Sequence, residues 1–197
     1  MDSPTQIRAR AWPWATAIVA LTAVITFSSA PLAEVFIYQR SLIFSGQIWR
    51  TWTGHIVHFG PSHLLWDLAV FLPAGCWLER LRPRCARWLY LLGPVVISIV
   101  LLALDPTLER YAGLSGLAMG TLVLLAAVQL QNRKESPWLW VVVLLLVAAK
   151  IAIELREGAP LLVSDFANIR NVPLAHFAGI SCGLICWLLL GRSRPAA

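Results

Sequence analysis

The sequence predicts an all-α membrane protein built from six transmembrane helices. Of its 197 residues, 58% are hydrophobic and only 13% are charged, whereas soluble domains carry about 25% charged residues. Apolar runs recur along the whole chain at roughly the length that spans a bilayer. The net charge of +6 sits in the short segments between these runs, which is typical of a membrane protein. It therefore does not indicate a nucleic-acid partner.

Each apolar run is expected to form one helix, because a helix satisfies its own backbone hydrogen bonds in lipid. The second and fifth runs are short for a span. The runs cover residues 12–30, 63–78, 86–104, 111–130, 138–153 and 173–190. Together they predict a single membrane domain over residues 12–191, with cytoplasmic tails at 1–11 and 192–197.

Two segments between or within the runs allow alternatives. Residues 12–30 end in Ser28-Ser29-Ala30, as a cleaved signal peptide would, but 19 residues exceed the usual 7–15 of a signal core. We therefore favour an uncleaved first helix. The loop 31–62 is apolar, and we expect it to lie in the membrane interface as short amphipathic segments. An ordinary packed loop is the alternative. The loop 154–172 is polar and is expected to be solvated.

The distribution of Lys and Arg predicts the orientation of the helices. Ten of these residues lie in the two tails and in the segments 80–87 and 133–134, against six in the longer segments on the other side. Since basic residues mark the cytoplasmic side, both termini are expected in the cytoplasm. The four cysteines then lie toward the cytoplasm, where no disulfide is expected.

Two helix heads carry polar residues that packing does not require. Ser115, within Gly113-Leu114-Ser115-Gly116, lies four residues into the fourth run, and His176 lies three residues into the sixth. Polar groups at membrane depth are costly and usually mark function. Ser115 and His176 are expected about 6 Å and 4.5 Å below the starts of their helices, at one level. His176 can then take the proton of Ser115 as its oxygen attacks a peptide carbonyl. No well-placed carboxylate is evident, which favours a dyad.

Small residues support this pairing of helices. Gly116 and Gly120 on one run, and Gly179 and Gly183 on the other, form Gly-x-x-x-Gly pairs that let helix backbones approach closely. His176 shares a helix face with Gly179 and Gly183, so the tightly packed face carries the histidine. Bundle packing alone is the alternative for the glycines, but it does not account for His176.

Peptide hydrolysis also needs donors aimed at the developing oxyanion. The head of the fourth run offers backbone amides, strengthened by the helix dipole. His63 can donate as well, whereas Asp67, one turn further on, cannot if it is ionised. Asp67 is either protonated in an apolar site or, as we favour, accepts from His63 and fixes its ring. The alternative is a buried pair that only ties the helix to the preceding loop.

These motifs, together with Trp49-Arg50 and the spacing His58-x4-His63, occur in one order between residues 49 and 183. This ordered set resembles the rhomboid family of intramembrane serine proteases. The resemblance implies a six-helix core in which Ser115 is the nucleophile and His176 the base.

The same resemblance implies an oxyanion hole made by His63 and the Ser115 amide. The supporting residues would be His58, Asp67, Gly113 and Gly116. It also implies a lateral structural role for the first loop, and a gating role for the fifth helix, past which a transmembrane substrate enters from lipid.

The chain departs from the family pattern at two positions. Asp67 stands where asparagine is usual, and Met119 stands where an aromatic residue or histidine often packs on the catalytic imidazole. The compact length and the segment Tyr111-Ala-Gly-Leu-Ser-Gly resemble the rhombosortase branch in particular. That branch is thought to process bacterial proteins bearing a C-terminal Gly-Gly, a hydrophobic helix and a basic tail. This implies a bacterial inner-membrane protein with its active site toward the periplasm.

Three other functions fit the sequence less well than a protease. An inactive rhomboid relative that escorts membrane proteins would be expected to lack Ser115 or His176. A metal site built from His55, His58 and His63 has no nearby Glu or Cys to complete it. An α/β-hydrolase would need a final glycine after the serine motif and a preceding strand. No metal or cofactor is therefore expected.

Overall fold

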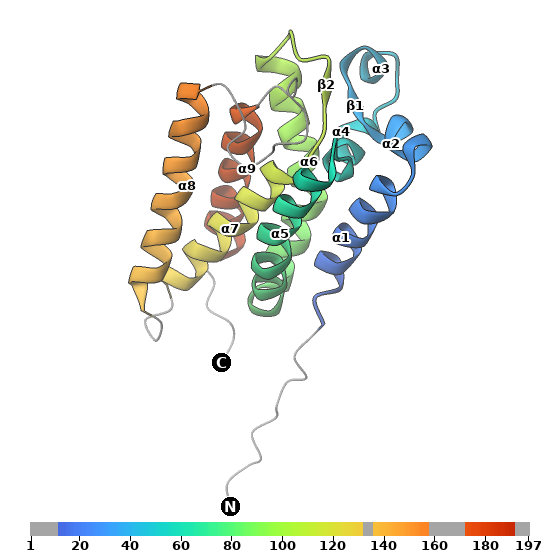
Figure 1. Ribbon diagram of the computed structural model, residues 1–197. Helices are drawn as coiled ribbons and strands as arrows, with labels where there is room; N and C mark the ends of the chain where they lie inside the picture. The colour runs from blue at the N-terminus through green and yellow to red at the C-terminus, as the bar shows by residue number, and fades with distance from the viewer. Residues whose placement is uncertain (1–11, 132–135, 158–171, 192–197) are drawn as a thin grey trace, which may run out of the picture.

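The computed structural model describes residues 12–131, 136–157 and 172–191 (Figure 1). Each predicted apolar run coincides with one long helix, and several of these helices extend beyond their runs. These helices are α1 (Trp14–Phe27), α5 (Pro61–Leu81), α6 (Pro83–Leu104), α7 (Ser115–Leu130), α8 (Pro137–Glu157) and α9 (Pro173–Cys186), which η2 (Trp187–Gly191) continues. The predicted tails 1–11 and 192–197 lie outside the described residues, as does most of the predicted polar loop. The start of that loop at Glu154 was wrong, because α8 continues through Glu157.

The described helices support an all-α membrane protein. Three of them are long and apolar enough to cross a membrane alone, namely α6, α8, and α9 with its continuation η2. Helix α1 reaches this length only together with α2 (Ala30–Phe36), from which it is bent by 116°, and α7 has 16 residues. Helix α5 carries Asp67, Glu79 and Arg80. The prediction of six spans therefore goes beyond what the length and composition of the helices establish.

The segment between α1 and α5 folds into short pieces, in agreement with the short segments predicted there. These are α2, β1 (Tyr38–Gln39), α3 (Arg40–Phe44), α4 (Arg50–Thr53) and η1 (Gly54–Ile56). Arg50, only 5% exposed, holds them together by donating to the carbonyls of Glu34 and Ile37 at 3.0 and 2.7 Å and to the Gln47 side chain at 2.8 Å. These oxygens compensate the buried charge.

A short antiparallel pairing links this segment to the region before α7. β1 pairs with β2 (Arg110–Tyr111), and Tyr38 lies opposite Tyr111. Both tyrosines are buried, and their rings meet edge to face at 6.1 Å between centroids. The first loop is thereby fixed to the chain that leads into Ser115.

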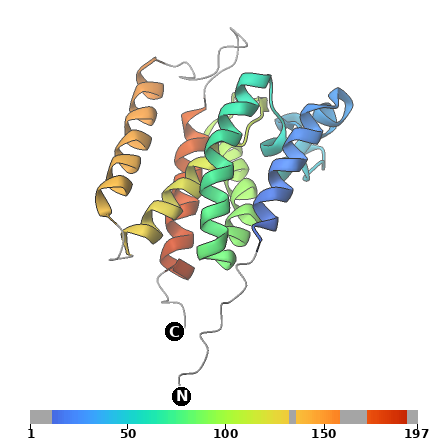
Figure 2. The same cartoon turned by 60° about the horizontal axis from the view of Figure 1, so that its bottom comes forward.

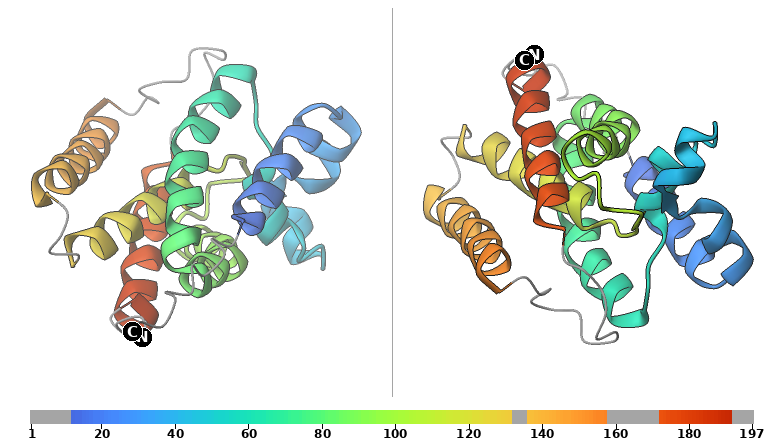
Figure 3. Two further views of the ribbon diagram at one scale, coloured as in Figure 1. Left: turned by 90° about the horizontal axis from the view of Figure 1, so that it is seen from below. Right: turned by 90° about the horizontal axis from the view of Figure 1, so that it is seen from above.

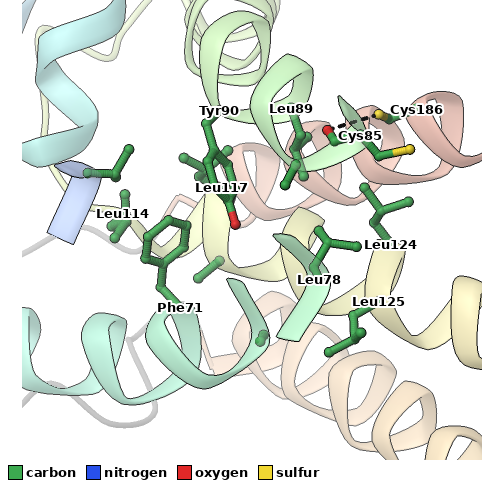
Figure 4. Packing of buried hydrophobic residues seen from close by; sticks show 14 of the residues in the cluster. Phe71, Leu78, Cys85, Leu89, Tyr90, Leu114, Leu117, Leu124, Leu125 and Cys186 are labelled. Atoms are coloured by element: carbon green, nitrogen blue, oxygen red, sulfur yellow. Dashed lines mark hydrogen bonds between the residues drawn. The ribbon is translucent and has the colours of Figure 1, made fainter. Parts of the chain in front are cut away.

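Helix α7 lies in the middle of the bundle, with α5, α6 and α9 around it (Figure 3). Twelve of its 16 residues are buried. Its leucines pack against an aromatic and aliphatic core from α5 and α6 (Figure 4). Examples are Phe71 and Leu78 of α5, Tyr90 of α6, and Leu117 and Leu124 of α7. A short helix that neighbours cover on all sides provides a rigid base for residues at its start.

A buried glutamate fastens α1 to the bundle. Glu79 of α5, 2% exposed, accepts the backbone N–H groups of Ala15 and Thr16 at 3.1 and 2.9 Å and the Thr16 hydroxyl at 2.9 Å. The first N–H groups of a helix have no partner within the helix, and a carboxylate there also meets the positive end of the helix dipole. Glu79 therefore caps α1 from a neighbouring helix.

Helix α8 stands apart from the other helices (Figures 1 and 2). Only 22% of its apolar span is buried, compared with 39% for α6 and 44% for α9 with η2. The start of α1 and the end of η2 lie at the same end of the bundle, and the C-terminal end of α8 lies at the opposite end (Figure 1).

Candidate active site

The heads of α7 and α9 are held together by backbone contact. A Cβ added to Gly179 would overlap the carbonyl oxygen of Gly116, and one added to Gly183 would overlap that of Gly120. This is the close approach that the two Gly-x-x-x-Gly pairs predict. Any side chain at these positions would force the two helices apart.

This contact brings the serine and the histidine together. Ser115 is the first residue of α7 and His176 is the fourth of α9. The Ser115 Oγ lies 3.0 Å from the His176 Nε2, and the His176 side chain is buried. A hydroxyl and an imidazole at hydrogen-bond distance have the geometry of a nucleophile and its general base.

The turn before Ser115 has a conformation that requires glycine. Gly113 has φ +127°, which side-chain-bearing residues rarely adopt. Its N–H donates to the Gly54 carbonyl at 3.3 Å, and its own carbonyl accepts the Tyr111 hydroxyl at 3.2 Å. A Cβ on Gly113 would lie 2.6 Å from the His63 Nε2, so His63 lies directly against this turn.

Asp67 holds the same turn from α5. Its Oδ2 accepts the backbone N–H of Leu114 at 2.7 Å and lies 3.1 Å from the His58 Nε2. The His63 Nε2 is further away, at 3.5 Å. The interpretation that Asp67 serves mainly to fix His63 therefore needs correction, since its two shorter contacts are with Leu114 and His58. By accepting this N–H, the Asp67 carboxylate positions Leu114, the residue that precedes Ser115.

The histidines divide into two groups. The metal-binding alternative joined His55 to His58 and His63, but the His55 Nε2 lies 3.1 Å from the Ser98 hydroxyl, on the side toward α6. His58, His63 and Asp67 do offer ligand atoms within 4.8 Å of one another. The His58 Nε2 lies at hydrogen-bond distance from the Asp67 Oδ2, 3.1 Å, and the His63 Nε2 lies 3.5 Å from the same oxygen.

A buried carboxylate that the sequence analysis missed lies on the other side of His176. The Glu154 Oε2 is 2.8 Å from the His176 Nδ1, and the other carboxylate oxygen is bonded to the Lys150 ammonium. The expectation that no carboxylate is placed for a third member was wrong. Lys150 and Glu154 form an i, i+4 charge pair at the end of an otherwise apolar run, and this spacing was the signal that could have revealed it.

Met119 follows Ser115 by one turn, at the position where the resemblance implies an aromatic residue or histidine. It packs with Val123 of its own helix and with Val147 and Ile151 of α8. It thus contributes to the apolar contact between α7 and α8.

The comparison with protein families decides the classification. The Rhomboid domain matches residues 45–193, well over half of the chain and all of the site described above. The chain belongs to the rhomboid family. This rhomboid protein is therefore a member of a family of intramembrane proteases. No match was found among the curated proteins.

Proposed function

We propose that this rhomboid protein is an active intramembrane serine endopeptidase with Ser115 as nucleophile and His176 as general base. The observation that carries the proposal is the 3.0 Å contact between the Ser115 Oγ and the His176 Nε2, made by two helices whose glycines fix their distance.

The reaction follows from this contact. The Ser115 oxygen bonds to the carbonyl carbon of the substrate, its proton passes to the His176 Nε2, and the carbonyl π pair moves onto oxygen. Collapse of this intermediate breaks the C–N bond, and the leaving amine takes the proton from His176. A water molecule then attacks the acyl-serine by the same route and restores the Ser115 hydroxyl.

The oxyanion needs donors near Ser115. The amides of Ser115 and Gly116 belong to the first turn of α7, where N–H groups have no partner within the helix. His63 lies against Gly113 and supplies a side-chain donor. The Leu114 amide is already taken by Asp67. An ionised Asp67 would repel an oxyanion, so we assign it to holding the turn.

We further propose that the substrate is a single-span membrane protein entering laterally from lipid, with a C-terminal Gly-Gly, hydrophobic and basic signal, as in the rhombosortase branch. Glycine near the cut weakens the substrate helix and lets it unwind into the site. The sparse burial of α8 supports a gating role for this helix.

The proposed location is the bacterial inner membrane, with both termini in the cytoplasm and the site toward the periplasm. The distribution of Lys and Arg supports this orientation. An inactive, escorting relative is the alternative, and the intact pairing of Ser115 with His176 does not favour it.

Co-expression with a reporter that ends in a Gly-Gly, hydrophobic and basic tail tests the proposal. We expect the wild-type chain to cleave the reporter and Ser115→Ala and His176→Ala to leave it intact. Cleavage that persists in either variant would contradict the proposed chemistry. A reporter whose two glycines are replaced by leucine tests the substrate class, and equal cleavage of both reporters would exclude Gly-Gly recognition.

A further inference from the structure

The proposed base has carboxylate and hydroxyl partners on opposite sides of its ring. The His176 Nε2 faces Ser115 at 3.0 Å, and the Nδ1 faces Glu154 at 2.8 Å. The Glu154 side chain is 2% exposed. A buried carboxylate at the far nitrogen of an imidazole orients the ring and fixes its tautomer.

The charges around Glu154 determine which tautomer this is. The ammonium of Lys150, one turn earlier on α8, pairs with Oε1 and favours the ionised carboxylate. An ionised carboxylate only accepts hydrogen bonds, so Oε2 must receive the Nδ1–H of His176. The lone pair of the neutral ring is then on Nε2, toward the Ser115 hydroxyl. Of the described residues whose charged or polar groups contact the His176 ring, Glu154 is the one that carries a negative charge.

The helix that carries Glu154 is the least buried of the three described helices that are long and apolar enough to cross a membrane alone. An apolar groove of about 550 Å³ lies between α8 and α9, and Val147 and Ile151 of α8 and Phe177 of α9 are among its lining residues. The hydrogen bond from His176 to Glu154 joins these two helices beside that groove. A displacement of α8 would therefore separate the carboxylate from the imidazole.

We propose that Glu154 is the third member of a Ser115–His176–Glu154 triad, a positioning residue that α8 supplies to the imidazole. The inference rests on the proposed protease function. During attack, Glu154 retains the Nδ1–H in its hydrogen bond while the Ser115 proton arrives at Nε2, and its charge stabilises the imidazolium that forms. Catalysis then requires that α8 be docked, so the proposed gating helix also controls the base.

A purely structural role is the competing explanation. Lys150 and Glu154 would then only neutralise each other at the end of an apolar helix, and His176 would need no partner. Glu79 offers a matched control, because it is an equally buried glutamate with several hydrogen bonds at the opposite end of α5 from the site. Loss of its charge should affect folding but not the chemistry of Ser115.

The test measures how fast a fluorophosphonate labels Ser115 in the purified full-length chain, as a function of pH. The variants are Glu154→Gln, Glu154→Asp, Glu79→Gln and, as the blank, Ser115→Ala. We expect Glu154→Gln to lower the labelling rate at the plateau roughly 10² to 10⁴-fold. Its pH profile should also differ from that of the wild type, because the imidazolium that forms during attack has lost an adjacent charge. The thermal midpoint of each variant reports whether it is folded.

The labelling rate of Glu79→Gln should stay within about threefold of the wild-type rate. Glu154→Asp keeps the charge on a side chain that is one methylene shorter, so its labelling rate should fall between those of the wild type and Glu154→Gln. If Glu154→Gln does not fold, slower labelling by folded Glu154→Asp supports the triad and a wild-type rate overturns it. A folded Glu154→Gln with the rate and pH profile of the wild type would overturn the triad alone. A wild type that labels no faster than Ser115→Ala would overturn the proposed function and the triad with it.

Discussion

Gly179 of α9 lies against the backbone carbonyl of Gly116 of α7, so closely that a methyl group at position 179 would overlap the oxygen. Gly116 adjoins Ser115, and Gly179 follows His176 by nearly one helical turn. The distance between the proposed nucleophile and base therefore depends on glycine at positions 116 and 179, where a side chain would push the helices apart.

We expect Gly179→Ala to lower stability by about 1–3 kcal/mol, because the helices must separate to admit the methyl group. Labelling of Ser115 by a fluorophosphonate should fall as well. Gly93→Ala on α6 is the control, since its methyl group would meet only the ends of leucine side chains, the nearest at 3.1 Å. Thermal unfolding and labelling rates measure both variants. Equal effects of the two substitutions would argue against a special contact between α7 and α9.

Asp67 provides a second prediction, based on its 2.7 Å hydrogen bond from the Leu114 amide. Asn in place of Asp67 keeps an oxygen that accepts this hydrogen bond, so Asp67→Asn should retain most of the labelling rate. Asp67→Ala removes the acceptor and should lower the rate roughly 10 to 100-fold, as expected for a lost hydrogen bond of about 1.5–3 kcal/mol. If Asp67→Asn is as slow as Asp67→Ala, the charge itself is required and the assigned role is wrong.

Glu79 should matter for the docking of α1 and not for catalysis. Removing its charge weakens the cap that it provides to Ala15 and Thr16, and we expect Glu79→Gln to lose about 1–3 kcal/mol of stability. Glu34→Gln removes only an exposed ion pair with Arg110 and should lose less than about 1 kcal/mol. Denaturation midpoints in one detergent compare the two variants. A Glu79→Gln protein as stable as the wild type would show that the cap contributes little.

His55 predicts a pH dependence of stability. Burial lowers the pKa of His55 to about 4, well below its ordinary value of 6.5. The unfolded side chain therefore binds a proton below about pH 6.5 while the folded one stays neutral, so stability should fall from about pH 6.5 to about pH 4. The loss attributable to His55 is about 3 kcal/mol.

His55→Gln cannot titrate and should flatten this part of the curve. Thermal midpoints of both proteins, measured from pH 7.5 to pH 4, provide the comparison. Identical slopes would mean that other groups are responsible for the acid sensitivity.

The sequence was most informative where local pattern determines geometry. Helix heads placed Ser115 and His176 at one level, and the spacing of Gly179 and Gly183 placed the histidine on the packed face. The first inference uses the rise per residue and the orientation of the helices, and the second uses the 3.6-residue period. The apolar runs likewise indicated where each long helix lies.

The contacts that the sequence did not reveal join side chains to distant backbone or to other helices. Glu154 looked like the start of a polar loop, because charged residues at the end of an apolar run fit a loop as well as a last helical turn. Asp67 was assigned to His63, its i+4 neighbour, whereas its shortest contact is to the Leu114 amide 47 residues away. Nothing in the sequence indicated that Glu79 caps α1. Such pairings depend on tertiary packing, which no local period encodes.

The central claim is that Ser115 is activated by His176. Mass spectrometry of the full-length chain after fluorophosphonate treatment tests it directly, by locating the adduct on the sequence. The account predicts an adduct on Ser115 in the wild type and none in His176→Ala. An adduct on another serine, or undiminished modification of Ser115 in folded His176→Ala, would contradict it.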